Sequence, residues 1–357
     1  MIWLFVLCSL GILAGFGLLW RVPRCNLAKA QPSQPVTVII PARNEEQNLP
    51  ALLNSLRDPS IKPQEIIVVD DASSDATALV ACRLGAQVIS SRELPGGWTG
   101  KTWACAQGAD TATADWFLFL DADTFFAPGG LAAVASLCGT ELNEAAAFSV
   151  LPYHIVRKPY EQLSLVFNLL MAFGAGGFGL VGGGRLFGQS LLIGRELYEQ
   201  CGGHSAVRGS ILENVALSSN IKAAGGRCVC VGGSGILNMR MFPNGLAQLR
   251  EGWTKAFADG AAASDQRVLF LAVLWLSQLS ATCILIALAH GGWRVSFALL
   301  YLCFVLQLAR LARPIGSYRL LTFVLYPLPL VFFFAIFGQS LLRRALNRKV
   351  TWRGRRI

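Results

Sequence analysis

Apolar segments without charged residues occur near both ends of the chain, and a polar region separates them. The first 20 residues contain no charged side chain. Twenty helical residues rise about 30 Å, which is the thickness of the hydrocarbon layer of a membrane. Three further apolar runs, 268–289, 295–309 and 320–342, follow the polar region. We expect residues 1–22 to form a transmembrane anchor and 268–342 to form transmembrane helices.

In the polar region, short apolar runs alternate with stretches that have helical spacing. Buried strands that alternate with helices indicate a parallel α/β sheet. We therefore expect an α/β domain over residues 33–235, followed by interfacial helices over 236–267. The expected strands are 36–40, 65–69, 86–90 and 116–120. Two of the expected helices are 45–57 and 103–113. A third helix is expected to be capped by residues 73–75 and to end at residue 84.

A further apolar run, 163–184, lies inside this domain and is rich in glycine. Each glycine in a helix interior is less favourable than alanine by about 1 kcal/mol. A single membrane crossing here would also put the two halves of the domain on opposite sides of the membrane. We expect an interfacial or acceptor-facing segment of the domain.

Composition argues against a wholly soluble protein. The chain is 54% hydrophobic and 15% charged, whereas about 25% charged residues is usual in soluble domains. Ten cysteines without a C-x-x-C motif, together with three histidines, give little basis for a zinc site. Reduced cysteines of this kind suit a cytosolic domain.

The net charge of +10 comes from the C-terminal region. All 21 acidic residues precede residue 268, and 11 of the 31 Lys and Arg follow residue 292. Basic residues that flank apolar segments mark the cytoplasmic face of a membrane protein, so we expect a basic cytoplasmic tail over 343–357. Four crossings would put this tail outside, unless the segment Tyr326-Pro-Leu-Pro329 breaks the last run into a re-entrant hairpin. No nucleic-acid partner is expected, because these basic residues are not clustered on the polar domain.

Acidic pairs follow two of the expected strands. Asp70 and Asp71 follow one strand, and Asp121 and Asp123 follow another. Ligands of open α/β sheets bind at the carboxyl ends of the strands. Two carboxylates at such a point are hard oxygen ligands for Mg²⁺ or Mn²⁺, which usually takes substrate phosphates as well. The pattern therefore indicates a metal-assisted phosphate site.

These residues also carry a resemblance to a known family. The motifs Pro41-Ala-Arg-Asn-Glu-Glu46, Val-Val-Asp-Asp71 and Asp-Ala-Asp123 resemble family 2 glycosyltransferases of the GT-A fold, over about 36–255. Within that family, the chain resembles the carotenoid, or diaponeurosporenoate, glycosyltransferases and the hopanoid-associated enzymes. The segments that carry this narrower resemblance are Gly97-Trp-Thr-Gly-Lys-Thr-Trp-Ala104, Phe187-Gly-Gln189, 211–225, Met239-Arg-Met-Phe-Pro243 and Glu251-Gly-Trp-Thr-Lys255.

The resemblance implies roles for individual residues of a nucleotide-sugar site. It implies that a carboxylate of the Asp70-Asp71 pair accepts a hydrogen bond from uracil. It also implies that Asp121 faces the ribose or the sugar and that Asp123 binds the metal, where Asp121 is a second candidate ligand. Lys101, just before an expected helix, is expected either to touch the diphosphate or to be solvated. The residues that would line the nucleotide pocket are Pro41, Ala42 and Glu45.

Glu213-Asn214 departs from the pattern of the family, which commonly has Glu-Asp at this point. An amide cannot serve as a general base, so Glu213 is the candidate base for the acceptor. Alternatively the acceptor needs no base, because a carboxylic acid with a pKa of about 4–5 is already ionised at pH 7. A surface glutamate on a helix is the third interpretation.

Four residues are candidates for contacts with the acceptor or with phosphate. Gln248-Leu-Arg-Glu-Gly-Trp253 resembles the Q-x-x-R-W element of processive synthases, but its spacing is Q-x-R-x-x-W. Trp253 could stack on a sugar or on the acceptor. The alternative is an amphipathic interfacial helix with its tryptophan at the bilayer boundary. The four candidates are Gln189, Arg250, Trp253 and Lys255.

The expected protein is a multi-pass enzyme of the cell membrane with a cytoplasmic GT-A domain. It would transfer a sugar, expected to be glucose, from a UDP-sugar to a lipid acceptor such as a carotenoid or related polyterpene. The resemblance implies that the configuration at the anomeric carbon is inverted. One alternative is transfer to a polyisoprenyl phosphate or a ceramide-like lipid. The other is a non-catalytic membrane protein that binds sugar nucleotides.

Overall fold

The chain contains two compact units. We call Pro23–His154 with Gly184–Arg240 the sheet unit, and Met1–Val22 with Ile155–Gly183 and Met241–Ile357 the helical unit. The structure is a computed structural model that describes residues 1–25, 34–58, 61–138, 145–174, 178–181, 184–262, 265–345, 351–352 and 355–356.

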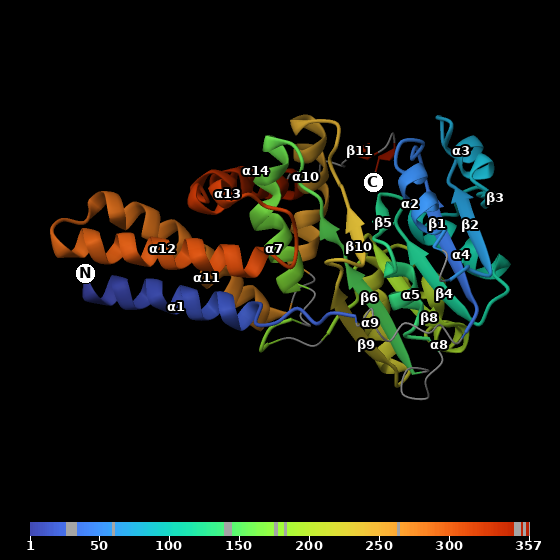
Figure 1. Ribbon diagram of the computed structural model, residues 1–357, viewed down its shortest axis with the longest axis horizontal. Helices are drawn as coiled ribbons and strands as arrows, with labels where there is room; N and C mark the ends of the chain where they lie inside the picture. Colours follow the sequence, from blue (N-terminus) through green and yellow to red (C-terminus); the bar gives the residue numbers. More distant parts are fainter. Residues whose placement is uncertain are drawn as a thin grey trace. The chain divides into compact units, whose positions relative to one another are not determined.

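A seven-stranded mixed sheet forms the centre of the sheet unit (Figure 1). Its strand order is β3-β2-β1-β4-β8-β6-β9. The first four of these strands are parallel, whereas β8 runs antiparallel to both of its neighbours. The expectation of a parallel sheet is therefore wrong for β8, because a buried strand has the same apolar pattern in either direction. The strands are β1 Val36–Ala42, β2 Glu65–Asp70, β3 Gln87–Ser90, β4 Trp116–Leu120, β6 Ala146–Leu151, β8 Ser190–Gly194 and β9 Arg227–Gly232.

Both faces of this sheet are covered by helices, so its central strands are buried on both sides. Val38 and Ile40 of β1 pack on one face with Leu52 of α2. Ile39 lies in the core on the other face, with Ala109 of α4. The continuous apolar runs of the sequence reflect this burial. The helices are α2 Leu49–Ser55, α3 Thr77–Arg83, α4 Gly100–Thr111, α5 Gly130–Ala135, α8 Arg195–Gln200, η3 Gly203–Val207 and α9 Glu213–Ala223.

A second, three-stranded sheet with the order β5-β10-β7 lies in the same unit. It contains β5 Thr124–Phe126, β7 Tyr153–His154 and β10 Leu237–Met239. Since β5 begins four residues after β4 ends, the chain turns sharply between the two sheets. The expected Asp121-Ala-Asp123 motif occupies this turn.

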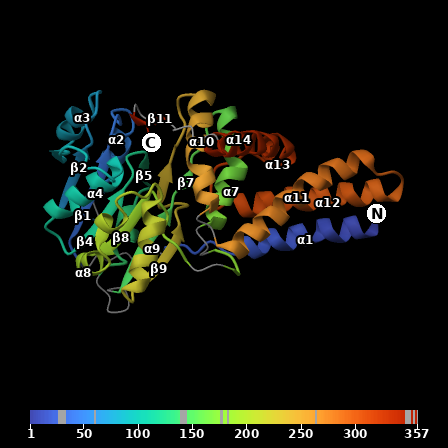
Figure 2. The same ribbon diagram turned by 180° about the vertical axis from the view of Figure 1, so that it is seen from behind.

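The helical unit combines the first helix with segments from the middle and the end of the chain. Figures 1 and 2 both show α1 alongside α11 and α12. Among the described residues, α11 and α12 are long and apolar enough to cross a membrane, whereas α1 has 17 residues and is shorter. The elements are α1 Ile2–Leu18, η2 Pro159–Ser164, α7 Leu165–Gly174, α10 Leu246–Ala262, α11 Gln266–Leu288, α12 Gly292–Ala312, α13 Leu320–Val324 and α14 Pro327–Ala345.

Buried polar groups join the three long helices. The side chain of Gln307 on α12 donates to the carbonyl of Ile12 on α1 at 2.6 Å, and it accepts from the Trp275 indole on α11 at 3.0 Å. Gly15 lets the helices approach, since a Cβ there would lie 2.7 Å from the Trp275 ring. Small residues and interhelical hydrogen bonds of this kind stabilise helix packing in membranes.

One segment of the helical unit differs from the expectation, and another follows a possibility that the sequence raised. The run 163–184, expected to belong to the α/β domain, instead supplies α7 to the helical unit. The last apolar run is broken into α13 and α14 before Pro327, which cannot continue a helix from its preceding turn. Of the basic tail, only two short strands are described beyond α14, β11 Thr351–Trp352 and β12 Arg355–Arg356.

Candidate active site

The carboxyl ends of β1, β2, β3 and β4 meet at one edge of the large sheet. Ala42 at the end of β1 pairs with Asp70 at the end of β2, and its carbonyl accepts from the Asp71 amide at 2.8 Å. The Asp70 carbonyl accepts from the Ser91 amide at 2.9 Å. Pro41 precedes Ala42 on the same strand, so four of the expected nucleotide residues share this edge.

The loop after β1 is held by hydrogen bonds to the loop after β2. The Glu45 amide donates to Thr77 Oγ1 at 2.8 Å, and the Glu45 carboxylate accepts from the Asn48 side chain at 2.7 Å. Arg43 donates to the Asp71 carbonyl at 2.8 Å. Glu45 is 6% exposed, so in this geometry its carboxylate serves the internal structure of the loop.

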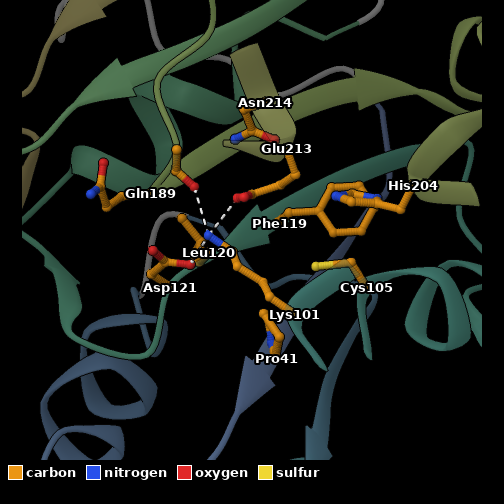
Figure 3. Close-up of a pocket in the computed structure, with 11 residues that line it drawn as sticks. Pro41, Lys101, Cys105, Phe119, Leu120, Asp121, Gln189, His204, Glu213 and Asn214 are labelled. Atoms are coloured by element: carbon orange, nitrogen blue, oxygen red, sulfur yellow. Dashed lines mark hydrogen bonds and ion pairs between the residues drawn. The ribbon is translucent and has the colours of Figure 1, made fainter. Parts of the chain in front are cut away.

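The turn after β4 positions the two carboxylates of the Asp121-Ala-Asp123 motif. The Asp121 carbonyl accepts both the amide and the hydroxyl of Thr124, at 3.1 and 2.7 Å. The Asp121 amide donates to the Gln189 carbonyl at 3.0 Å. Asp121 and Asp123 are both half-buried in this turn, and Asp121 lines the pocket shown in Figure 3.

Lys101 is the centre of the polar contacts in this pocket (Figure 3). Its ammonium nitrogen lies 2.7 Å from Asp121 Oδ1 and 2.6 Å from Glu213 Oε1, and it donates to the Gly188 carbonyl at 3.0 Å. Lys101 lies in the first turn of α4, where Thr99 caps the helix by accepting from the Thr102 amide. The cap fixes the start of α4 and therefore the direction of the lysine.

Glu213 begins α9, and its carboxylate points into the pocket toward Lys101 (Figure 3). It is 4% exposed. Burial raises the pKa of the Glu213 carboxyl, and the Lys101 ammonium opposes this rise. Burial by itself would lower the pKa of Lys101, but the carboxylates of Asp121 and Glu213 hold it above its usual value. Lys101 is therefore a cation at neutral pH, and the buried carboxyl group of Glu213 lies beside it.

Asn214 has a structural partner of its own. Its side-chain amide donates to the Phe187 carbonyl at 2.8 Å, in a position where Asn214 is 4% exposed. Ser149 accepts from the Phe187 amide at 2.6 Å and donates to the same carbonyl at 3.2 Å. These bonds fix the segment that presents Gly188 to Lys101 and Gln189 to the pocket. An amide donor, and not a carboxylate, is what this position requires.

Comparisons with known proteins agree with this geometry. Residues 37–215 match the model of glycosyl transferase family 2. A 4,4'-diaponeurosporenoate glycosyltransferase of Staphylococcus aureus strain MRSA252 is 34% identical over 329 residues, which are 90% of this chain and 87% of the relative. The chain belongs to glycosyl transferase family 2. It is therefore a glycosyltransferase.

Other similar proteins give the same family and fold. The 4,4'-diaponeurosporenoate glycosyltransferase of S. aureus strain USA300 is 33% identical over 330 residues, with the same shares of the two chains. A mannosyltransferase from Pyrobaculum calidifontis, solved in complex with GDP-Man and Mn²⁺, has a TM-score of 0.53 at 18% identity. The match covers 97% of this chain and 100% of that one. The sheet unit therefore has the GT-A-like α/β fold that the sequence predicts.

The pocket of this glycosyltransferase brings together only part of the predicted site. It contains Pro41, Lys101, Asp121, Gln189 and Glu213. The other nucleotide candidates and Asp123 lie along the same sheet edge but are not among the lining residues. The buried Oε1 of Gln189 has no hydrogen-bond partner among the described residues, so it is available to a donor on a ligand.

Sequence reasoning missed several residues that line this pocket. Cys105 lies one helical turn after Lys101 on α4, and this i, i+4 spacing could have indicated it. His204 was not indicated by any motif, because it reaches the pocket from the short helix η3. Burial, with Lys101 nearby, lowers the pKa of His204 to about 3, so the imidazole is neutral at pH 7. The lining residues that were not predicted as ligand contacts are Cys105, Phe119, Leu120, Gly188, His204 and Asn214.

The candidates on α10 belong to the helical unit. Trp253 is 1% exposed, its ring stacks on Phe167 with centroids 4.6 Å apart, and its indole donates to Ser164 Oγ at 3.1 Å. This tryptophan is thus a packing residue, without a free face for a sugar. Arg250 is exposed on the same helix. Lys255 lies on α10, but its side chain is outside the described part of the structure.

The carboxylates of the turn after β4 fit a divalent cation that shares its ligands with a substrate. Asp121 and Asp123 supply hard oxygen atoms, which Mg²⁺ and Mn²⁺ prefer. In the described part of the chain, no three His, Cys, Asp or Glu side chains are grouped closely enough to hold an ion. An ion at this turn would therefore need oxygens from phosphate and water to complete its shell, as Mg²⁺ commonly does.

Proposed function

We propose that this glycosyltransferase is a membrane-bound, metal-dependent, inverting enzyme that transfers glucose from UDP-glucose to the carboxyl group of a polyterpene such as a carotenoid acid. The observation that carries the proposal is the pocket in which Lys101 joins Asp121, at the nucleotide edge of the sheet, to Glu213 on α9. A carboxylate at the nucleotide edge and a candidate base thus contact the same ammonium group.

The donor is proposed to bind along the sheet edge with its base near Asp70. The buried Oδ1 of Asp70 has no hydrogen-bond partner among the described residues. The uracil imide offers an N–H that would satisfy this oxygen, and a buried acceptor left unsatisfied costs about 1–3 kcal/mol. Pro41, Ala42 and Asp71 would line the same nucleotide site, with Glu45 holding the loop.

Asp123, together with Asp121, would hold a Mg²⁺ or Mn²⁺ ion that arrives with the nucleotide. Such an ion supplies neutralisation of the negative charge that develops on the diphosphate leaving group. Lys101 adds a fixed positive charge at the same edge, and Gln189 offers a free acceptor for a hydroxyl of the sugar.

The acceptor oxygen is proposed to attack the anomeric carbon on the face opposite the diphosphate. The new bond forms from that oxygen to the anomeric carbon, the bond from this carbon to the phosphate oxygen breaks, and UDP leaves with the electron pair. A hydroxyl acceptor would lose its proton to Glu213. A carboxylic acid of pKa about 4–5 is already ionised at pH 7 and needs no base. The names of the two Staphylococcus relatives, which refer to diaponeurosporenoate, support the carboxylate acceptor.

The helical unit is proposed to sit in the membrane and to receive the lipid acceptor. Large apolar side chains are exposed on its long helices, among them Trp3 (81%), Phe270 (68%) and Leu306 (61%). The surfaces of soluble proteins rarely expose many large apolar side chains together. We propose the expected boundaries, with 1–22 as the anchor, 236–267 at the interface and 268–342 in the membrane. The sheet unit and the basic tail would face the cytoplasm, where Arg250 and Lys255 of α10 would contact lipid phosphates.

The experiment supplies membranes that contain the chain with radiolabelled UDP-glucose, Mn²⁺ and one acceptor at a time. The acceptors are a carotenoid acid, the matching carotenoid alcohol, a polyisoprenyl phosphate and ceramide. Labelled pigment from the acid, separated by chromatography of the organic phase, is the expected result. Label that enters only the polyisoprenyl phosphate or ceramide would replace the proposed acceptor. Binding of UDP without transfer to any acceptor would contradict the proposal and favour a non-catalytic sugar-nucleotide-binding protein.

A further inference from the structure

The ammonium nitrogen of Lys101 is already surrounded by protein oxygens. An ammonium donates three hydrogen bonds, and three oxygens surround this one, from Asp121, Glu213 and Gly188, at 2.7, 2.6 and 3.0 Å. A phosphate that approaches Lys101 must therefore replace one of these partners. The order in which phosphate arrives and a partner of Lys101 is released can therefore be tested with variants of the pocket residues.

The two carboxylate partners of Lys101 are not equally easy to release. The Glu213 side chain is 5% exposed, so without Lys101 it would be a buried carboxylate with no counterion. Removing one partner of a buried pair is strongly destabilising, by about 3–5 kcal/mol. The Asp121 side chain is 27% exposed and lies at the open edge of the sheet, in the turn with Asp123. Of the two carboxylates, Asp121 is therefore the one that Lys101 can give up.

We propose that Lys101 is a built-in counterion that keeps a divalent cation away from Asp121 until a nucleotide diphosphate enters, and that then remains with Glu213. This inference rests on the proposed function, since it concerns the loading of the same donor site. Lys101 is a positioning residue in this scheme, because it acts through the two carboxylates that it joins.

The charges of the pocket support this exchange. With Lys101 present, the positive charge of its ammonium lies 2.7 Å from Asp121 Oδ1 and opposes the approach of a divalent cation. Without the ammonium, the Asp121 carboxylate attracts a divalent cation more strongly at the short distances of a half-buried site. A diphosphate brings its own negative charge and its own oxygen ligands, so it lets the cation bind while Lys101 stays in place. The wild-type site should therefore take up metal together with nucleotide and poorly without it.

The test measures binding of Mn²⁺ to the full chain in detergent, with and without UDP, from the electron paramagnetic resonance signal of free Mn²⁺. Wild type is expected to bind Mn²⁺ weakly alone and at least tenfold more tightly with UDP. Lys101→Met is expected to bind Mn²⁺ alone at least tenfold more tightly than wild type, with a smaller effect of UDP. Lys101→Arg, which keeps the charge, should behave as wild type. Lys222→Met, at an exposed lysine of α9, is the matched control and should also behave as wild type.

A second pair of variants removes the risk that Lys101→Met unfolds because Glu213 loses its counterion. Glu213→Gln keeps the contact between Lys101 and Asp121, and the double variant Lys101→Met with Glu213→Gln loses it without leaving a buried charge. The double variant should bind Mn²⁺ alone at least tenfold more tightly than Glu213→Gln. Equal affinities in this pair, or in Lys101→Met and wild type, would overturn the inference.

The outcomes separate this inference from the proposed function. Wild type that transfers glucose and binds Mn²⁺ with UDP, together with equal Mn²⁺ affinities in the variant pairs, would overturn the counterion role alone. Folded wild type that binds no Mn²⁺ even with UDP, and transfers no label, would overturn both.

Discussion

Replacing Asn214 by aspartate would place a carboxyl group where an amide now donates to the Phe187 carbonyl at 2.8 Å. The family pattern makes this substitution look like the repair of a lost base. The geometry gives the opposite expectation, because an ionised carboxylate has no hydrogen to donate and would face a carbonyl oxygen in a buried position. The variant must either break this contact or hold its new carboxyl group in the protonated form.

The cost of protonation follows from the pH. With an unfolded pKa of about 3.9, keeping an aspartate protonated costs about 1.5 kcal/mol at pH 5 and about 4 kcal/mol at pH 7, since each pH unit contributes about 1.36 kcal/mol. The folded variant then has a raised pKa and binds more protons than the unfolded chain. Its stability is thus greatest at low pH and falls as the pH rises through the folded value. About 4 kcal/mol is a ceiling at pH 7, because breaking the contact limits the loss.

The assay is urea unfolding of the full chain in detergent at pH 5, 6 and 7, followed by tryptophan fluorescence. Asn214→Ala loses the same hydrogen bond without adding a charge, so it should cost about 1–3 kcal/mol at every pH. Asn54→Asp, at an exposed position of α2, is the matched control and should stay within about 0.5 kcal/mol of wild type. If Asn214→Asp were as stable as wild type at pH 7, or transferred sugar faster, the reasoning on Asn214 would be refuted.

Three further substitutions test other parts of the structure. Glu213→Gln should reduce transfer to a hydroxyl acceptor by about 10²–10⁴-fold but transfer to a carboxylate acceptor much less, in parallel assays with labelled donor; equal losses would argue against a base. Gly130→Ala should lower the unfolding free energy by about 1–3 kcal/mol, because the added Cβ would lie 2.2 Å from the Ile236 carbonyl oxygen. The control Gly96→Ala adds a Cβ that meets no atom within 4 Å, so it should leave the unfolding free energy unchanged in the same urea assay. Gln307→Leu removes the bond to α1 and should cost about 0.6–2 kcal/mol in unfolding by SDS; no change would mean that this buried bond does not stabilise the bundle.

The sheet edge could be predicted from the sequence because its signals are local. β4 has the same bounds as its apolar run, and Asp121 follows it directly. The strand ends at Ala42 and Asp70 come together because parallel strands share one carboxyl edge. These residues can be predicted without knowing which distant segments contact one another.

The rest of the pocket depends on contacts between distant segments. Lys101 and Glu213 are 112 positions apart, and their meeting depends on how α4 and α9 pack on the sheet. Asn214 has the type of residue that suggests a lost base, but its partner on the Phe187 carbonyl is visible only in the structure. The buried environment of Trp253 is likewise set by Phe167 and Ser164 from a remote segment.

The most direct test of the proposed enzyme compares purified full chain with its Asp123→Asn variant. Both are given UDP-glucose labelled in the sugar, Mn²⁺ and a carotenoid acid, and circular dichroism checks that both are folded. The account predicts labelled glucosyl pigment from wild type and at least a hundredfold less from the variant. Equal label from the two proteins, or no labelled pigment from a folded wild type that binds UDP, would contradict it.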